Sequence, residues 1–193
     1  MFLNKIKLII IFLLCYQTQL FSKSTTLNNF DKKNLSEYFS GIIAFENKDN
    51  SKALDFFNAS KNLLNHHDPF LERYINSLVL ENKVSQAINI IKKNKEKKSS
   101  DFFDANLLLI IDSLKKDDLD RANSYLKETI DFVEKDRLKL IILDGLQQYI
   151  YVFKEKKISK NKKNFGKLSL ISETFQRCYL GDELTDSYFS NLI

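Results

Sequence analysis

The sequence predicts an all-α fold built from helical hairpins, and three observations lead to this class. The 193 residues include only one proline and four glycines, too few for a sheet protein with many tight turns. Leucine, isoleucine and phenylalanine recur at helical spacing along most of the chain. One pattern also repeats: Ala53, Ala87 and Ala122 each stand at the head of an amphipathic segment, at intervals of 34 and 35 residues.

Residues 1–24 are expected to be a signal peptide rather than part of the fold. Lys5 and Lys7 give a basic start, residues 8–16 are apolar, and residues 22–24 offer small side chains for cleavage. The protein is therefore expected to be exported, with a periplasmic location. An uncleaved signal anchor is the alternative, although the apolar run is shorter than the about 20 residues that span a bilayer.

Removal of the predicted signal changes the charge of the protein. The full chain has 30 Lys+Arg against 25 Asp+Glu, a net charge of +5, of which Lys5, Lys7 and Lys23 supply three positive charges. The remaining lysines cluster in residues 92–98 and 154–163. Both runs fall where helices should end, and cations are favourable there. We therefore expect no nucleic-acid partner, and membrane contact only transiently through the signal peptide.

The two cysteines argue against a disulfide framework. Cys15 lies in the predicted signal, and a lipoprotein signal there is disfavoured because Leu14 precedes it where a small residue is needed. Only Cys178 then remains, so stability must come from packing. A reactive thiol is one interpretation of Cys178; burial as a small hydrophobic residue is the favoured one.

The first hairpin is expected to follow a flexible lead-in over residues 25–33. Asn34 begins a capping-box sequence, NLSE, and the first helix should end near Asn47. Asn50 or Ser51 is expected to cap the second helix. The apolar face of the first helix should contain Leu35, Phe39, Ile42 and Ile43.

The next two hairpins carry comparable start signals. Asp68 directly before Pro69 predicts a helix start, because an acidic side chain can cap and proline suits the first helical position. Asn82 and Asp117 are expected to cap the second helices of these hairpins. The three repeats together should occupy residues 34–135.

Residues 136–193 are expected to form further helices, as degenerate repeats or as the start of a longer array. One helix is predicted over residues 136–154 and another over residues 165–180. The chain ends on apolar residues, 188–193, whereas a repeat array should close with a polar cap. The sequence is therefore expected to be an N-terminal piece of a longer protein, or to dock on another chain. The buried face of the second helix should contain Leu168, Ile171, Phe175, Cys178 and Tyr179.

The first hairpin places small or aromatic residues at five positions that recur in a known class of helical repeat: Gly41, Ala44, Ala53, Phe57 and Ser60. In these residues it resembles a tetratricopeptide (TPR) repeat. The second and third hairpins have Ile75 and Ile110 at the glycine position of that repeat, so they resemble degenerate copies. The resemblance implies a right-handed α-solenoid of TPR-like hairpins, and the exported, lysine- and asparagine-rich chain is similar to exported TPR proteins of alphaproteobacteria.

No recognisable catalytic chemistry stands out in the sequence. It contains no GxSxG, no HExxH and no glycine-rich phosphate loop. His66 and His67 could suggest a metal site, but adjacent histidines in a turn without a nearby cysteine favour a solvated connection. Asp117 and Asp118 are better explained by helix capping. We therefore expect no enzyme activity, no cofactor and no metal.

Recognition of a partner is the function that remains. In TPR proteins the first helix of each hairpin lines a concave groove, although each candidate residue could equally be solvated or packed. The prediction is a non-enzymatic scaffold or adaptor of the bacterial cell envelope that binds a partner protein or peptide. The alternative is a structural or self-assembling helical-repeat subunit. The candidate groove residues are Tyr38, Ile42, Phe45, Glu72, Arg73, Asn76, Asp104, Ile111 and Lys115.

Overall fold

A computed structural model of the chain describes residues 32–133, 136–160 and 163–192. Within these ranges the protein is all-helical and contains no strand, which confirms the predicted all-α class. The predicted signal peptide, residues 1–24, lies outside the described residues. The helices are α2 (Lys32–Glu46), α3 (Asn50–Ala59), α4 (Asp68–Leu80), α5 (Val84–Lys93), α6 (Phe103–Lys115), α7 (Leu119–Phe132), α8 (Arg137–Glu155), α9 (Lys167–Leu180) and α10 (Thr185–Ser190), with short 3-10 turns at Lys61–Asn65 and Lys98–Ser100.

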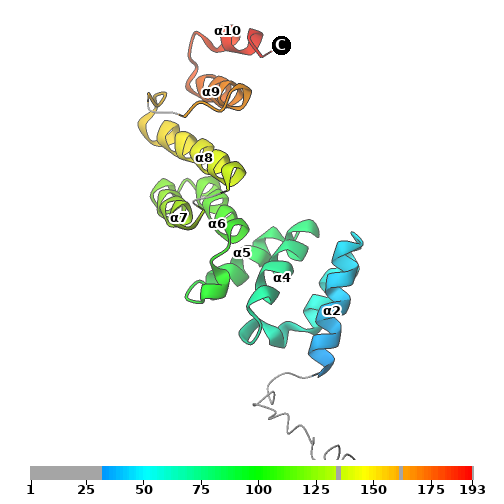
Figure 1. Cartoon of the computed structure of the whole chain (residues 1–193). Coiled ribbons are helices and arrows are strands. Elements are labelled where there is room, and N and C mark those ends of the chain that lie inside the picture. The colour runs from blue at the N-terminus through cyan, green and yellow to red at the C-terminus, as the bar shows by residue number, and fades with distance from the viewer. Residues whose placement is uncertain (1–31, 134–135, 161–162, 193) are drawn as a thin grey trace, which may run out of the picture.

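The helices follow one another along an elongated array, with α2 at one end and α10 at the other (Figure 1). Contacts join mainly helices that are consecutive in the chain. The helix pairs α2–α3, α4–α5 and α6–α7 are each connected by a tight turn, and we call them hairpins 1, 2 and 3. None of the described helices combines the length and the apolar character that crossing a bilayer requires.

The turn inside each hairpin has the same backbone geometry. Lys48, Asn82 and Asp117 are left-handed, with φ of 61°, 58° and 57°. In each turn the next residue donates its N–H to a carbonyl five residues back, which is the Schellman arrangement that ends a helix. These bonds are Asp49 to Ala44 (3.0 Å), Lys83 to Leu78 (2.8 Å) and Asp118 to Ser113 (2.9 Å).

Two further features recur in the second helix of each hairpin. The alanine at its head, Ala53, Ala87 or Ala122, is fully buried. A polar residue near its end donates a side-chain hydrogen bond to the carbonyl four residues earlier. These bonds are Ser60 to Phe56 (2.8 Å), Asn94 to Ile90 (2.8 Å) and Thr129 to Tyr125 (2.6 Å). The repeated sequence pattern therefore corresponds to a repeated local structure.

Hairpin 1 differs from the others at the glycine position. A β-carbon added to Gly41 would lie 2.8 Å from the ring of Phe57, so only glycine leaves room for this ring. At the positions equivalent to Gly41 and Phe57, hairpins 2 and 3 have a residue larger than glycine and a residue smaller than phenylalanine. These residues are Ile75 and Ile91 in hairpin 2 and Ile110 and Leu126 in hairpin 3, all fully buried.

Two hydrophobic clusters form the core of the described chain. The first draws on α2 to α6 and contains four packed rings together with aliphatic side chains. Tyr74 also donates a hydrogen bond from its hydroxyl to Asn58 of α3 (2.9 Å), which ties hairpin 2 to hairpin 1. The second cluster joins α6, α7 and α8. The rings of the first cluster are Tyr38, Phe57, Phe70 and Tyr74.

Several helix starts differ from the prediction, most by one residue. α2 already contains Asn34, so Asn34 does not cap it. Asp49, and neither Asn50 nor Ser51, caps α3 by accepting from the N–H of Lys52. At α4 the cap position is His67, which places Asp68 and Pro69 inside the first turn.

The cap predictions at Asn82 and Asp117 are wrong for a common reason. Both residues take the left-handed position of the turn, which asparagine and aspartate tolerate better than most side chains. The next residue then occupies the cap. For α7 this is Asp118, whose carboxylate accepts from the N–H of Arg121 at 3.1 Å.

The faces of α2 and α9 also differ from the prediction. Phe39 and Ile43 of α2 are 58% and 63% exposed, although the sequence placed them on the buried face. α9 buries polar residues instead: Glu173, Thr174 and Gln176. The residues predicted to be buried on α9 are exposed, and Cys178 is therefore not a buried hydrophobic residue: Leu168, Ile171, Phe175, Cys178 and Tyr179.

Candidate partner-binding surface

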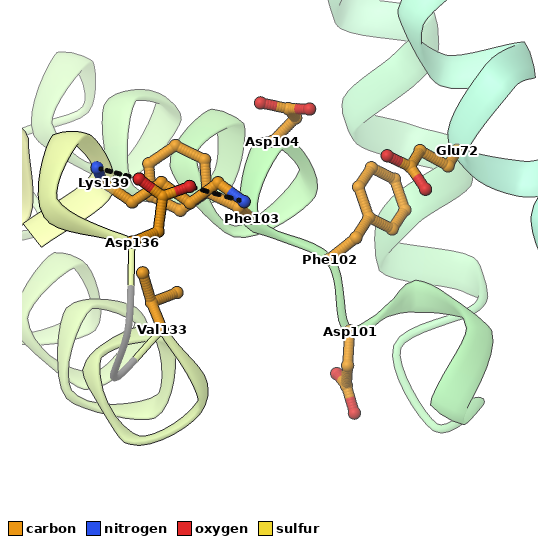
Figure 2. A pocket seen from close by; sticks show the side chains of 8 residues that line it. All are labelled: Glu72, Asp101, Phe102, Phe103, Asp104, Val133, Asp136 and Lys139. Atoms are coloured by element: carbon orange, nitrogen blue, oxygen red, sulfur yellow. Dashed lines mark hydrogen bonds and ion pairs between the residues drawn. The ribbon is translucent and has the colours of Figure 1, made fainter.

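A pocket of about 380 Å³ lies where α4, the start of α6 and the start of α8 meet (Figure 2). We call it the α4–α6 pocket. It forms because the connection from hairpin 2 to hairpin 3 passes close to the end of α7. The residues that line it are Glu72, Asp101, Phe102, Phe103, Asp104, Val133, Asp136 and Lys139.

The connection before α6 supplies both the aromatic and the acidic part of the pocket. Phe102 is extended, with φ −124° and ψ 155°, and precedes the first residue of α6. This extended residue lets Phe102 and Phe103 diverge. In Figure 2 the Phe102 ring points toward Glu72 of α4, whereas Phe103 lies beside Asp136. Asp101 and Asp104 flank the two rings in sequence and are both exposed.

The wall of the pocket opposite Phe102 contains an ion pair between Asp136 and Lys139. Asp136 caps α8 by accepting from the N–H groups of Leu138 (3.1 Å) and Lys139 (3.2 Å). These bonds, led by the one from the Lys139 backbone, lower the pKa of the Asp136 carboxyl. The Lys139 ammonium pairs with the same carboxylate at 3.4 Å and stands 5.4 Å from the centre of the Phe103 ring.

The rim of the pocket keeps a net negative charge. Asp136 and Lys139 neutralise each other, which leaves Glu72, Asp101 and Asp104. No ion pair to these three carboxylates occurs within the part of the chain that the structure describes. A cationic group of a partner would therefore meet uncompensated carboxylates next to aromatic rings, a combination that favours lysine and arginine.

The structure brings some predicted groove residues together and separates others. Glu72 and Asp104, from α4 and α6, both line the α4–α6 pocket. Ile111 and Lys115 lie further along α6, exposed and outside the pocket lining. Asn76 is half-buried on α4.

The remaining predicted groove residues lie closer to the core. Tyr38 is only 3% exposed, so it is not available as a surface contact. Burial raises the pKa of its hydroxyl, partly offset by nearby Arg73. Arg73 also pairs with Glu46 at 3.5 Å. Ile42 and Phe45 are partly buried against the first hydrophobic cluster.

Sequence reasoning missed the aromatic wall of the pocket. Asp101, Phe102, Phe103 and Asp104 are consecutive, so two rings between two carboxylates directly before a helix were visible in the sequence. Asp136 and Lys139 could not be placed beside them, because more than 30 residues separate them from Asp104.

Within the described residues, no group of three or more histidine, cysteine, aspartate or glutamate side chains is arranged to hold a metal ion. The ring of His67 packs edge-on against Tyr38, with centroids 4.9 Å apart. Comparison of the chain with protein-family models, with curated proteins and with solved structures found no significant match.

Proposed function

We propose that this protein is a non-enzymatic adaptor of the bacterial cell envelope that binds a segment of a partner protein at the α4–α6 pocket. The observation that carries the proposal is the pocket itself, with an aromatic wall from Phe102 and Phe103 and uncompensated carboxylates on its rim. Its volume of about 380 Å³ is at the small end of ligand sites, which run from roughly 300 to 1,000 Å³. One or two side chains fit such a space.

The proposal also covers the arrangement of the three hairpins, because this arrangement positions the pocket. In it, the hairpins are degenerate TPR-like repeats stacked as a right-handed α-solenoid. The repeated left-handed turn and the repeated back hydrogen bond of the second helices support this. In such an array the first helices face the groove, and Glu72 and Asp104 stand on the first helices of hairpins 2 and 3.

The ligand class follows from the chemistry of the rim. An extended partner segment would place a lysine or arginine side chain between Glu72 and Asp104, with its cation next to an aromatic ring. An adjacent apolar residue would contact Phe102. This mode of recognition combines charge and apolar contact and requires no reacting group.

Selection of peptides from a displayed random library on the full chain tests the binding. Enriched sequences should carry lysine or arginine next to an apolar residue, and a synthetic peptide of that sequence should bind with an affinity that falls as salt rises. The double variant Glu72→Gln/Asp104→Asn should weaken binding of this peptide about tenfold, since the two lost charge contacts together are worth about 1.4 kcal/mol.

A matched control variant removes the same number of negative charges at positions outside the pocket. Asp55→Asn/Glu96→Gln removes one aspartate and one glutamate that are exposed and outside the pocket. Its peptide affinity should equal that of the unmodified chain. Enrichment of acidic or uncharged peptides, or equal loss in both double variants, would contradict the proposal.

The envelope location rests on the sequence of residues 1–24. A fusion of the chain to a reporter that is active only after export should be active, and deletion of residues 1–24 should abolish this activity. An inactive fusion would remove the location from the proposal while leaving the pocket and its ligand class to the peptide experiment.

A further inference from the structure

One exposed face of α2 is equivalent in position to faces of α4 and α6 that are covered by the preceding hairpin. Alignment of the hairpins on their turns places four residues of α2 at positions where α4 and α6 meet the preceding hairpin. In α4 these positions contact hairpin 1: Phe70 lies against Tyr38 and Phe57, and Tyr74 binds Asn58. The four residues, which we call the α2 face, are Ser36, Phe39, Ser40 and Ile43.

The burial of equivalent positions shows what the α2 face lacks. Ser77 of α4 is fully buried, whereas its equivalent Ile43 is 63% exposed. The next equivalent, Asp112 of α6, keeps only 11% of its side chain exposed because Lys92 of hairpin 2 covers it at 2.7 Å. Phe39 is 58% exposed. The α2 face thus occupies the hairpin-joining positions, carries two large exposed apolar side chains, Phe39 and Ile43, and has no described hairpin in front of it.

The opposite end of the array presents a second apolar surface. Four residues of α9 recur at intervals of three or four and form one stripe, and Phe189 of α10 extends it by packing on Phe175 at 6.1 Å. We call these five residues the α9 face. Their exposed fractions are Leu168 54%, Ile171 38%, Phe175 53%, Tyr179 51% and Phe189 38%.

We infer that copies of this protein associate head to tail, with the α9 face of one copy covering the α2 face of the next. Both faces are apolar, and they lie at opposite ends of the array (Figure 1). Some of the exposed charges near the two faces are complementary: Lys32 begins α2, whereas Glu183 and Asp186 lie at the start of α10. A contact between two different faces repeats from copy to copy, and so forms a filament or a ring rather than a closed pair.

The inference does not depend on the α4–α6 pocket, because neither face includes a residue that lines it. It gives the structural-subunit alternative a definite interface. It also predicts that assemblies have a direction, because each copy has one α2 face and one α9 face and can bind only the other kind of face on its neighbour.

Sedimentation of the full chain over a range of concentrations tests the association. The average mass should rise beyond that of a dimer. Ile43→Asp and Phe175→Asp, one on each face, should each weaken association at least tenfold and leave monomers at concentrations where the unmodified chain associates. Leu80→Asp is the matched control, because Leu80 of α4 is 51% exposed and belongs to neither face. Its association should be unchanged.

A mixture of the two variants gives the sharpest result. Each variant retains one intact face, so the mixture should form one-to-one dimers and nothing larger. Monomers in the mixture, association in either variant alone, or loss of association only in Phe175→Asp would each overturn the inference. A monomeric full chain that associates only after removal of residues 1–31 would also overturn it, because that segment would then cover the α2 face. Circular dichroism of every variant checks that its helices are retained.

Discussion

The helices α2 to α4 bury four aromatic rings in one cluster, whereas α9 and α10 expose three. In the first region four rings pack on one another with at most 3% of each residue exposed: Tyr38, Phe57, Phe70 and Tyr74. In the second region three rings are between 38% and 53% exposed: Phe175, Tyr179 and Phe189. The two regions have similar helical amphipathicity in sequence, so their difference lies in what covers the apolar side.

Polar contacts hold the second region together instead. Arg177 pairs with Glu173 at 2.6 Å and with Asp182 at 3.0 Å, and its guanidinium stands 4.2 Å from the centre of the Tyr188 ring. The comparison teaches that two neighbouring parts of one array can be stabilised in different ways. Hydrophobic burial stabilises the first hairpins, while polar contacts stabilise the C-terminal helices, whose apolar side chains remain exposed.

The largest expected difference comes from the same substitution in both regions. Phe57→Ala should lower the free energy of unfolding by about 3–5 kcal/mol, because it leaves a cavity among buried rings. Phe175→Ala should change it by no more than about 0.5 kcal/mol, because the ring is half exposed. Urea unfolding at concentrations below self-association measures both. Equal effects would remove the distinction between the regions.

A glycine-to-alanine pair should give effects of opposite sign. Gly41→Ala forces a methyl group to within 2.8 Å of the Phe57 ring and should destabilise the chain by about 1–3 kcal/mol. Gly145→Ala in α8 meets no atom within 4 Å and should stabilise it by about 0.5–1 kcal/mol through helix propensity.

A double variant tests whether the Phe57 ring causes the destabilisation by Gly41→Ala. Phe57→Leu imitates the smaller residue of hairpin 3, so Gly41→Ala should cost less in its presence, with a coupling of about 0.5–3 kcal/mol. Thermal unfolding of the single and double variants measures this coupling. If the two changes in unfolding free energy simply add, the Phe57 ring is not the reason that position 41 requires glycine.

Arg177→Gln should loosen the C-terminal helices selectively. The substitution removes the guanidinium that pairs with both Glu173, whose side chain is only 11% exposed, and Asp182, at a cost of about 1–3 kcal/mol. Hydrogen exchange of the amides of α10 should therefore accelerate about tenfold or more, while α2 to α5 remain protected. Uniform acceleration along the chain would show that the two regions unfold as one unit.

The smallest effect concerns pH and the joint between hairpins 2 and 3. Hydrogen bonds from Lys116 and Lys92 lower the pKa of the Asp112 carboxyl. Its folded pKa is therefore below the unfolded value of about 3.9, so its stabilisation is present above about pH 5 and is lost as the pH falls through 3.9 toward the folded pKa. The two lysines are partly exposed, which limits the contribution at neutral pH to about 1 kcal/mol.

Urea unfolding of the unmodified chain and of Asp112→Asn between pH 3 and pH 7 measures this contribution. Their difference in unfolding free energy should shrink as the pH falls below about 5. A difference for Asp112→Asn that is constant with pH would contradict the assignment.

The sequence predicted the helical class and the places where the chain turns, because local signals determine both. Proline, polar turns and the repeated alanines mark them directly. The exact caps were missed because the turns offer two or more neighbouring capping residues, as at Asp117 and Asp118. Which of the two caps depends on which one takes the left-handed position, and no glycine marks that position.

The sequence predicted burial less accurately than it predicted helices. Periodicity identifies an apolar stripe on a helix, but it does not show which element packs against that stripe. The residues from Leu168 to Tyr179 form a regular stripe, yet α9 turns Thr174 and Gln176 inward. Gln176 meets Gln148 of α8 at 3.2 Å, a contact between residues 28 positions apart that no local pattern indicates. For the same reason Tyr38 was expected at an open surface and lies in the core.

The succession of contacts between neighbouring helices has a consequence for how the chain folds. Because contacts join mainly consecutive helices, little loop-closure entropy opposes them, and folding can proceed rapidly from local pieces. Hairpin 1 can be complete before the later helices exist, and each finished pair offers a template for the one that follows. A polypeptide emerging amino end first from a ribosome or a translocation pore is thus expected to gain structure stepwise and without waiting for its last residues.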